Sequence, residues 1–187
     1  MACPHERTRV ADRDPAVAAL LPSVRRVAVV GDTHLPRGAR RLPDECLDRL
    51  RAGDLIVHAG DFVGYEVLAF LRGLGPPVVA VRGNVDDERL RGELPGACTF
   101  AAGAATIGLV HDAGRRAGRA ERLAARFPGC AAVVYGHTHL PELARHSGTW
   151  IVNPGSPTEP RRSPVRTMLE LVVESAAVEP RLIELHS

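Results

Sequence analysis

Seven polar side chains in this sequence have the types and spacing of metal ligands. They are two aspartates, one asparagine and four histidines, namely Asp32, His34, Asp61, Asn84, His111, His137 and His139. Imidazole nitrogens and carboxylate oxygens suit borderline divalent metals such as Mn, Fe and Zn. Seven ligands exceed the three protein groups of one catalytic zinc, and they fit two metal ions that share a carboxylate. The set therefore predicts a dinuclear metal centre, whose expected reaction is hydrolysis at phosphorus.

Apolar runs place these ligands at the ends of strands. Five runs predict buried strands: 27–30, 55–57, 78–81, 107–110 and 131–134. One or two of these side chains follow each run. In α/β proteins, bound molecules and ions lie beyond the carboxyl ends of the strands. Asp32 and His34 are two positions apart, so in an extended backbone both side chains point the same way, and His137 and His139 repeat this spacing. We therefore expect the ligands to converge at one edge of the sheet.

The remaining segments predict a mixed α/β fold. Helical patterns cover 43–51, 65–72, 86–94 and 119–127. Further strands are expected at 97–101, 104–110, 142–146, 149–152, 166–173 and 178–185. The first three strands alternate with helices, which predicts a parallel sheet, whereas 97–101 and 104–110 predict a hairpin.

The order Asp-x-His, Gly-Asp, Gly-Asn, His and Gly-His-x-His resembles the calcineurin-like metallophosphoesterases over residues 27–156. The tetrapeptides at 136–139 and 153–156, together with the short chain, are similar to the small YfcE-type branch, whose members are Mn-dependent phosphodiesterases. The resemblance implies a four-layer αββα sandwich of two mixed β-sheets flanked by helices.

The resemblance also implies a role for each ligand. Asp32, His34 and His139 would hold the first metal, Asn84, His111 and His137 the second, and Asp61 would bridge them. Two ions roughly 3.5–4 Å apart hold a bridging hydroxide for in-line attack on phosphorus. We therefore expect a phosphodiesterase with two divalent ions as cofactors and with Asp61, Asn84 and His111 as catalytic residues. Mn is the expected metal, and Ni, Fe, Zn or Mg are alternatives because such sites accept several divalent ions.

Two positions depart from the pattern of many relatives. Val85 follows Asn84 where many phosphatases of the superfamily carry a histidine that protonates the leaving group. The YfcE-type branch also lacks this histidine, so the general acid is unassigned and good leaving groups should react best. Asp112 follows His111 where relatives commonly carry glycine, and its carboxylate either strengthens metal binding or repels phosphate.

Several other polar residues have more than one interpretation. His58 is expected to be a buried imidazole or a support for a metal ligand, and Asp86 and Asp87 are expected to cap the helix 86–94. The segment 153–156 is either a strand-ending turn or a loop near the metals. Six arginines either contact phosphate oxygens or belong to solvated loops: Arg37, Arg40, Arg41, Arg82, Arg115 and Arg116.

Composition limits the other classes of function. The chain has 187 residues and a net charge of +2, and it contains no lysine. We expect one domain at 24–187 after a loosely ordered leader at 1–23. Four cysteines without a motif favour buried positions and a reducing, cytoplasmic location. No apolar run approaches the roughly 20 residues of a membrane helix, so no membrane is expected as a partner. The 4% of aromatic residues give no strong signal for nucleic-acid binding, so nucleic acid is not expected either.

Alternative functions stay open at this point. The retromer subunit related to this branch keeps the fold and serves mainly as a protein-interaction scaffold, so a catalytically weak scaffold is one alternative. Phosphomonoesterase or nuclease activity is another. The expected partner is a small phosphoester substrate, and a homo-oligomer is open because relatives often form dimers or tetramers.

Overall fold

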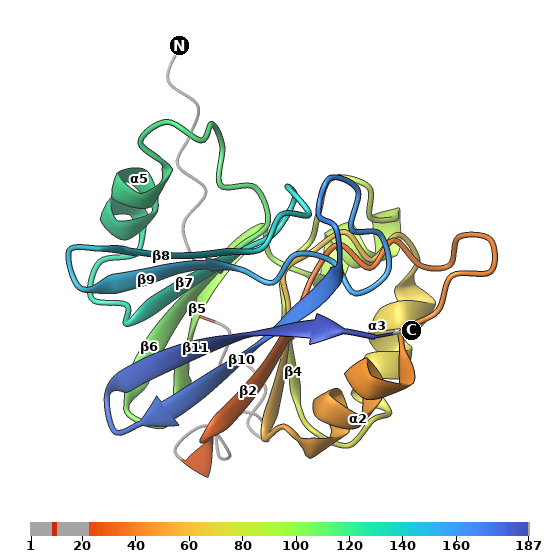
Figure 1. Ribbon diagram of the computed structural model, residues 1–187, viewed down its shortest axis with the longest axis horizontal. Helices are drawn as coiled ribbons and strands as arrows, with labels where there is room; N and C mark the ends of the chain where they lie inside the picture. Colours follow the sequence, from red (N-terminus) through yellow and green to blue (C-terminus); the bar gives the residue numbers. More distant parts are fainter. Residues whose placement is uncertain (1–8, 11–22, 187) are drawn as a thin grey trace.

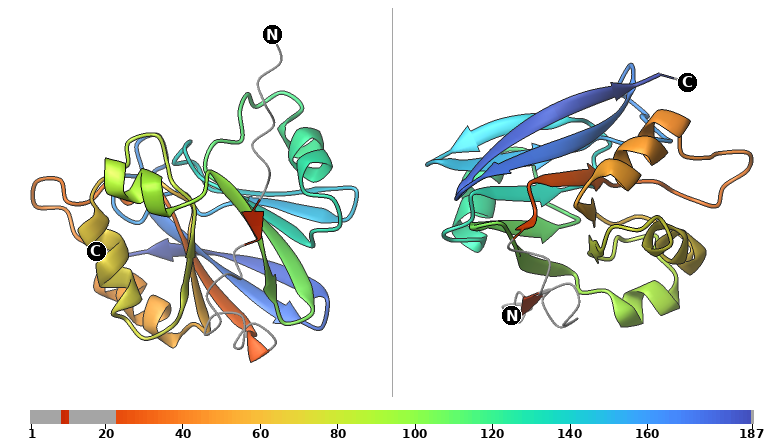
Figure 2. Two further views of the ribbon diagram at one scale, coloured as in Figure 1. Left: turned by 180° about the vertical axis from the view of Figure 1, so that it is seen from behind. Right: turned by 90° about the horizontal axis from the view of Figure 1, so that it is seen from below.

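Two β-sheets packed face to face form the centre of the protein, and helices cover both outer faces (Figure 1). The computed structural model describes residues 9–10 and 23–186. Helix α5 (Arg119–Arg126) lies on the outer face of one sheet, and α2 (Asp44–Ala52) and α3 (Tyr65–Arg72) lie on the outer face of the other. Figure 2 shows the same order of layers from below. The expected αββα sandwich of two mixed sheets is confirmed.

The first sheet has the strand order β11-β10-β2-β3-β4. Its strands are β2 (Arg26–Val30), β3 (Leu55–His58), β4 (Val78–Ala80), β10 (Arg166–Glu174) and β11 (Ala177–Leu185). Strands β2, β3 and β4 are parallel, as their alternation with helices predicts, and β10 pairs antiparallel with both β2 and β11. The carboxyl ends of the three parallel strands therefore meet at one edge.

The second sheet has the strand order β1-β5-β6-β7-β9-β8. Its strands are β1 (Arg9–Val10), β5 (Ala97–Ala102), β6 (Ala105–Val110), β7 (Ala132–Tyr135), β8 (Glu142–His146) and β9 (Thr149–Asn153). Strands β6, β7 and β9 are parallel, whereas β5–β6 and β8–β9 are antiparallel hairpins. A fourth helix, α4 (Glu88–Glu93), follows β4 in the chain.

Three apolar layers hold the sandwich together. In β2, Val27 and Val29 pack between the two sheets, whereas Ala28 and Val30 pack against the helices α2 and α3. This strand is buried on both faces, which explains why its sequence is a continuous apolar run and does not alternate. The third layer lies between the second sheet and α5, whose Leu123 is buried.

Part of the predicted leader contributes to the second sheet. Arg9–Val10 form β1, which pairs parallel with β5. Residues 1–8 and 11–22 lie outside the described residues, so the boundary between leader and domain stays a prediction. Among the described residues, no helix has both the length and the apolar character needed to cross a membrane.

Three cysteines are buried as the sequence predicts, which makes their thiols unreactive. Cys46 and Cys98 are 0% exposed, and burial raises the pKa of both thiols to about 12. Cys130 is also buried, and burial raises its pKa. Cys3 lies outside the described residues, so the test uses a Cys3→Ser variant.

We expect the native Cys3→Ser protein to resist Ellman's reagent, because thiolates are the reactive form and these three thiols lack both charge and access. Unfolding in guanidinium chloride should release three reactive thiols, the free cysteines of the described chain. The absorbance of the thiolate that the reagent releases measures the number of reactive cysteines in the native and in the unfolded protein. Rapid labelling of the native variant would contradict the packing of α2, β5 and the α5–β7 segment.

Candidate metal centre

All seven ligands predicted from the sequence lie where the parallel strands of both sheets end. Two groups have ligand atoms within 4.8 Å of one another: Asp32, His34 and His139, and Asp61, His111 and His137. Asn84 joins the second group, because its Oδ1 lies 3.0 Å from His137 Nδ1 and 3.1 Å from His111 Nε2. The structure thus brings together seven residues that the chain spreads over more than a hundred positions.

Most of these residues have left-handed backbone. The φ angle is 52° at Asp32, 46° at His34, 59° at Asp61, 69° at His137 and 58° at His139. Such conformations cost of the order of 1–3 kcal/mol each and persist only where the surroundings enforce them. Hydrogen bonds between neighbouring loops do so here, because Asp32 N donates to Gly60 O at 2.9 Å and His34 N donates to Asp61 O at 3.0 Å.

The prediction that an extended backbone aligns the paired ligands is wrong. Asp32 and His34 do join one group, but they do so from left-handed turns. His137 and His139 have the same spacing and enter different groups. The tight turn after β7, and not a two-residue period, decides where each imidazole points.

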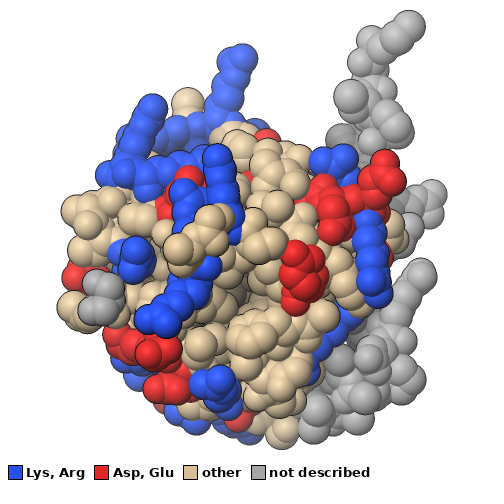
Figure 3. All heavy atoms as spheres, turned by 90° about the vertical axis from the view of Figure 1, so that its right-hand side faces the viewer, with Lys and Arg blue, Asp and Glu red and all other residues tan. Residues whose placement is uncertain are grey.

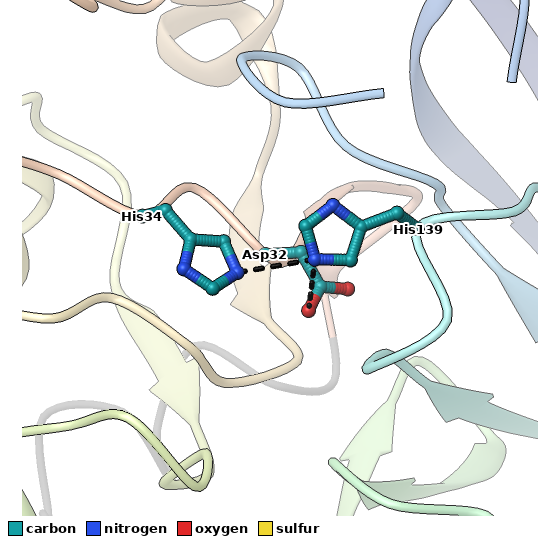
Figure 4. Close-up of side chains that lie close together, drawn as sticks. All are labelled: Asp32, His34 and His139. Carbon is teal, nitrogen blue, oxygen red and sulfur yellow. Dashed lines mark hydrogen bonds and ion pairs between the residues drawn. The ribbon is translucent and has the colours of Figure 1, made fainter. Parts of the chain in front are cut away.

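The first group is buried. His34 Nε2 lies 3.1 Å from His139 Nε2, which in turn lies 3.5 Å from Asp32 Oδ1. Figure 4 shows the two imidazoles facing each other with the carboxylate beside them. All three residues are at most 2% exposed. This geometry leaves two ring nitrogens and a carboxylate oxygen directed at one point.

The second group is partly open to solvent. His111 is buried, whereas His137 is exposed. Asp61 Oδ1 lies 3.3 Å from His111 Nε2, and Asp61 Oδ2 lies 3.5 Å from His34 Nε2 in the first group. Asp61 therefore stands between the two groups, and the second group is open to solvent at His137.

Burial changes the pKa values of these ligands in opposite directions. It raises the pKa of Asp32 to about 7 and lowers the pKa of His34 to about 4. Burial alone would raise the pKa of Asp61, but hydrogen bonding and charge from His111 bring it down to about 2. Burial also opposes charge on His111, yet its contact with Asp61 raises its pKa overall. A cation at the first group would displace the proton from Asp32, since metals bind the ionised carboxylate.

The hydrogen bonds of two histidines show that the ligands suit cations. His111 Nδ1 lies 2.7 Å from Ala59 O, which can only accept, so the ring donates there through Nδ1. Its Nε2 faces the oxygens of Asn84 and Asp61, and it offers them a proton when the ring is charged and offers a metal ion its lone pair when the ring is neutral. His139 is held likewise by Glu159 O at 2.5 Å, so its Nε2 lone pair faces His34.

Lone pairs that face one another repel unless a proton or a metal ion lies between them. Asp32 Oδ2 adds a buried oxygen without a hydrogen-bond partner among the described residues. Imidazole nitrogens oriented by carbonyls, together with unpaired carboxylate oxygens, are the usual environment of a bound metal ion. The residues present therefore fit two divalent metal ions.

Comparison with known proteins agrees with this geometry. The model of the calcineurin-like phosphoesterase superfamily domain matches residues 26–176. The chain belongs to this superfamily. A probable metallophosphoesterase from Methanocaldococcus jannaschii is 35% identical over 158 residues, which cover 84% of this chain and 80% of that protein. The family uses divalent metal ions, and this chain has two groups of residues able to hold them.

Solved structures show the same fold. Vps29 from Entamoeba histolytica complexed with zinc is 24% identical, with a TM-score of 0.68 over 85% of this chain and 98% of that chain. A structure described as a novel archaeal phosphodiesterase is 20% identical, with a TM-score of 0.66 over 86% of this chain and 99% of that chain. Both likenesses concern the fold.

Two buried residues brace the phosphoesterase ligand loops without joining the metal groups. His58 Nε2 lies 3.1 Å from Thr33 Oγ1, and His58 Nδ1 accepts from Gly60 N at 3.1 Å. Both contacts are expected for a supporting imidazole. Asp86 accepts from Gly83 N at 2.6 Å and therefore holds the turn before Asn84. Asp87 alone caps α4, accepting from Leu90 N at 2.8 Å, so the prediction that Asp86 caps this helix is wrong.

The segment 153–156 lies beside the first group, which agrees with its interpretation as a loop near the metal site. Ser156 Oγ donates to Asp32 O at 2.7 Å, and Asn153 Nδ2 donates to Gly136 O at 2.9 Å. These bonds tie the end of β9 to the turns after β2 and β7. The segment is thus both a strand-ending turn and a support for the ligand loops.

Glu159 is a residue that sequence reasoning missed. Its backbone oxygen orients His139, and its Oε2 lies 3.9 Å from His34 Nδ1. Arg40 Nη2 donates to Glu159 Oε1 at 3.0 Å. A signal was present, because Glu159 follows the segment 153–156 by three positions, but a lone glutamate among prolines carries no ligand spacing.

Proposed function

We propose that this protein is a dinuclear metal-dependent phosphodiesterase whose substrate is a small phosphoester. The observation that carries the proposal is the position of Asp61. One of its oxygens lies 3.3 Å from His111 Nε2 and the other lies 3.5 Å from His34 Nε2, so a single carboxylate reaches both ligand groups. A residue in this position can bridge two metal ions.

When bound, two divalent ions would supply an acidified water as nucleophile and would neutralise charge on the phosphoryl oxygens. The chain itself fixes the ligands before substrate arrives, since backbone carbonyls orient His111 and His139. Asp32 and Asp61 bring two negative charges against two divalent cations, and Asn84 adds none. The site therefore keeps a positive charge that attracts a phosphate anion.

The residues near Asn84 favour substrates with good leaving groups. Val85 is 40% exposed at the position where many relatives carry a histidine, and its backbone N donates to Asp61 Oδ1 at 3.1 Å. Asp86 is buried and holds the turn, so it is not free to donate a proton to a substrate. Without a strong general acid, an aryl diester with a stable leaving group should react fastest.

The test is hydrolysis of bis-p-nitrophenyl phosphate and p-nitrophenyl phosphate by protein stripped with EDTA and refilled with Mn, Mg, Ni or Zn. We expect no turnover by the stripped protein and restored turnover with metal, highest with Mn and greater for the diester. Metal content after purification without added metal provides a second readout. A folded protein that binds none of these metals, or turns over neither ester with any of them, would leave the scaffold function of the fold as the better explanation.

A further inference from the structure

Five arginines lie in two loops beside the first ligand group, and we call them the arginine rim. They are Arg37, Arg40 and Arg41 from the loop after β2, and Arg161 and Arg162 from the loop before β10. Arg40 is half-buried and the other four are exposed. Figure 3 looks onto the side from which the loop after β2 projects, and basic side chains gather over the upper left of this face.

Two members of the rim contact the same carboxylate. Arg40 Nη2 lies 3.0 Å from Glu159 Oε1, and Arg161 Nη2 lies 3.7 Å from Glu159 Oε2. The same Oε2 lies 3.9 Å from His34 Nδ1. Glu159 therefore contacts guanidinium groups from two separate loops beside the first ligand group, with a hydrogen bond to Arg40 and an ion pair to the exposed Arg161.

One carboxylate cannot use all the hydrogen-bond donors of two guanidinium groups. Each guanidinium has five N–H donors in a rigid fork. Arg40 Nη1 is buried and has no hydrogen-bond partner among the described residues. Arg161 has left-handed backbone with a φ of 52°, a strained conformation that persists where the surroundings enforce it. Solvent can accept from the exposed Arg161, and a phosphate that replaced this water would offer several oxygens in the geometry that guanidinium groups match.

The arginine rim lies beside the first ligand group, away from the position that a reacting phosphorus would occupy. A phosphorus attacked between two metal ions must face both ligand groups. Glu159 contacts His34 and His139, which both belong to the first group, and the two arginines contact Glu159. A substrate bound over both groups would therefore extend its attached group across the first one towards the rim.

From these contacts we infer that the arginine rim, chiefly Arg40 and Arg161, binds a second phosphate of the substrate. The inference rests on the proposed function and narrows its substrate class to phosphodiesters that carry a further phosphate, such as a phosphorylated nucleotide ester. Glu159 acts as a positioning residue, because its carboxylate contacts both arginines while the subsite is empty.

A matched pair of substrates tests this subsite. The p-nitrophenyl ester of thymidine 3′-phosphate and its 5′-phosphorylated form share one scissile bond and differ only by the distant phosphate. We expect the metal-loaded protein to prefer the phosphorylated ester in kcat/KM by roughly 10- to 100-fold, the usual range for charged hydrogen bonds. Arg161→Gln and Arg40→Gln should each move this ratio towards one.

The control is Arg181→Gln, which removes the same charge from β11, where Arg181 is exposed and paired with Glu179. It should keep the ratio of the unmodified protein. Equal kcat/KM for both esters in the unmodified protein would overturn the inference and leave the proposed function standing. A loss in Arg161→Gln that is equal for both esters would also overturn it, because the guanidinium would then contact the scissile phosphate.

Binding without turnover separates this inference from the proposed function. Calorimetry should give a lower Kd for thymidine 3′,5′-bisphosphate than for thymidine 3′-monophosphate, and Arg161→Gln should remove the difference. If neither ester is hydrolysed but this difference is found, the subsite is supported and the phosphodiesterase proposal fails. Equal Kd values for the two nucleotides would overturn the subsite whatever the turnover.

Discussion

Replacing Asp61 by asparagine should lower kcat/KM for bis-p-nitrophenyl phosphate by roughly 100- to 1000-fold, because several kcal/mol of transition-state stabilisation depend on two metals held together. Asparagine can adopt the left-handed backbone of this position, where φ is 59°, and can still accept from Val85 N. The substitution therefore removes the negative charge and the second bridging oxygen with little change to the turn. We expect the number of bound Mn ions per chain, measured by mass spectrometry of the metal content, to fall from two.

Asp112 provides the matched control for Asp61. It follows His111 in the chain, but it is exposed and its Oδ1 accepts from Gly114 N at 2.7 Å. Asp112→Asn keeps this bond and removes the same charge, so we expect kcat/KM within about threefold of the unmodified protein. An Asp61→Asn variant that retains two metal ions and normal turnover would refute the bridging role.

Replacing Gly83 by alanine should displace the Asp61 carboxylate while leaving the aspartate itself in the chain. A Cβ at Gly83 would lie 2.0 Å from Asp61 Oδ1 and 2.2 Å from Asp61 N, so Asp61 or the turn at Gly83 must move. Neither moves freely, because Gly83 N donates to the buried Asp86 and Asp61 O accepts from His34 N. We expect a loss of stability of about 1–3 kcal/mol and a fall in kcat/KM of at least about 100-fold.

Gly92→Ala is the control for this substitution, since it makes the same chemical change in helix α4. Nothing lies within 4 Å of a Cβ at Gly92. Alanine should therefore stabilise the protein by about 0.5–1 kcal/mol, through helix propensity, and should leave turnover unchanged. Urea unfolding and initial rates measure both variants. Equal stability and equal rates for Gly83→Ala and Gly92→Ala would mean that Gly83 does not contact Asp61.

The sequence alone indicated which residues could hold metal ions and which elements surround them. The ligands could be found because apolar runs mark the strands and polar residues such as Asp61 and His111 follow directly. Helices such as α3 (Tyr65–Arg72) were also predictable, because glycines end them and their apolar faces repeat locally. These signals depend on neighbours in the chain, so local patterns suffice to detect them.

Other features were decided only by the tertiary structure. His34 and His139 are 105 positions apart, and no local pattern records that their nitrogens face each other. The antiparallel place of β10 beside β2 and the left-handed turns of Asp32 and His34 are enforced by hydrogen bonds between distant segments. Glu159 acquires its role from the same long-range packing, because it meets Arg40 and His34 only when the loop before β10 closes over the end of β2. Residue types thus indicate the possible chemistry, whereas the packing of long loops decides which candidate ligands lie close together.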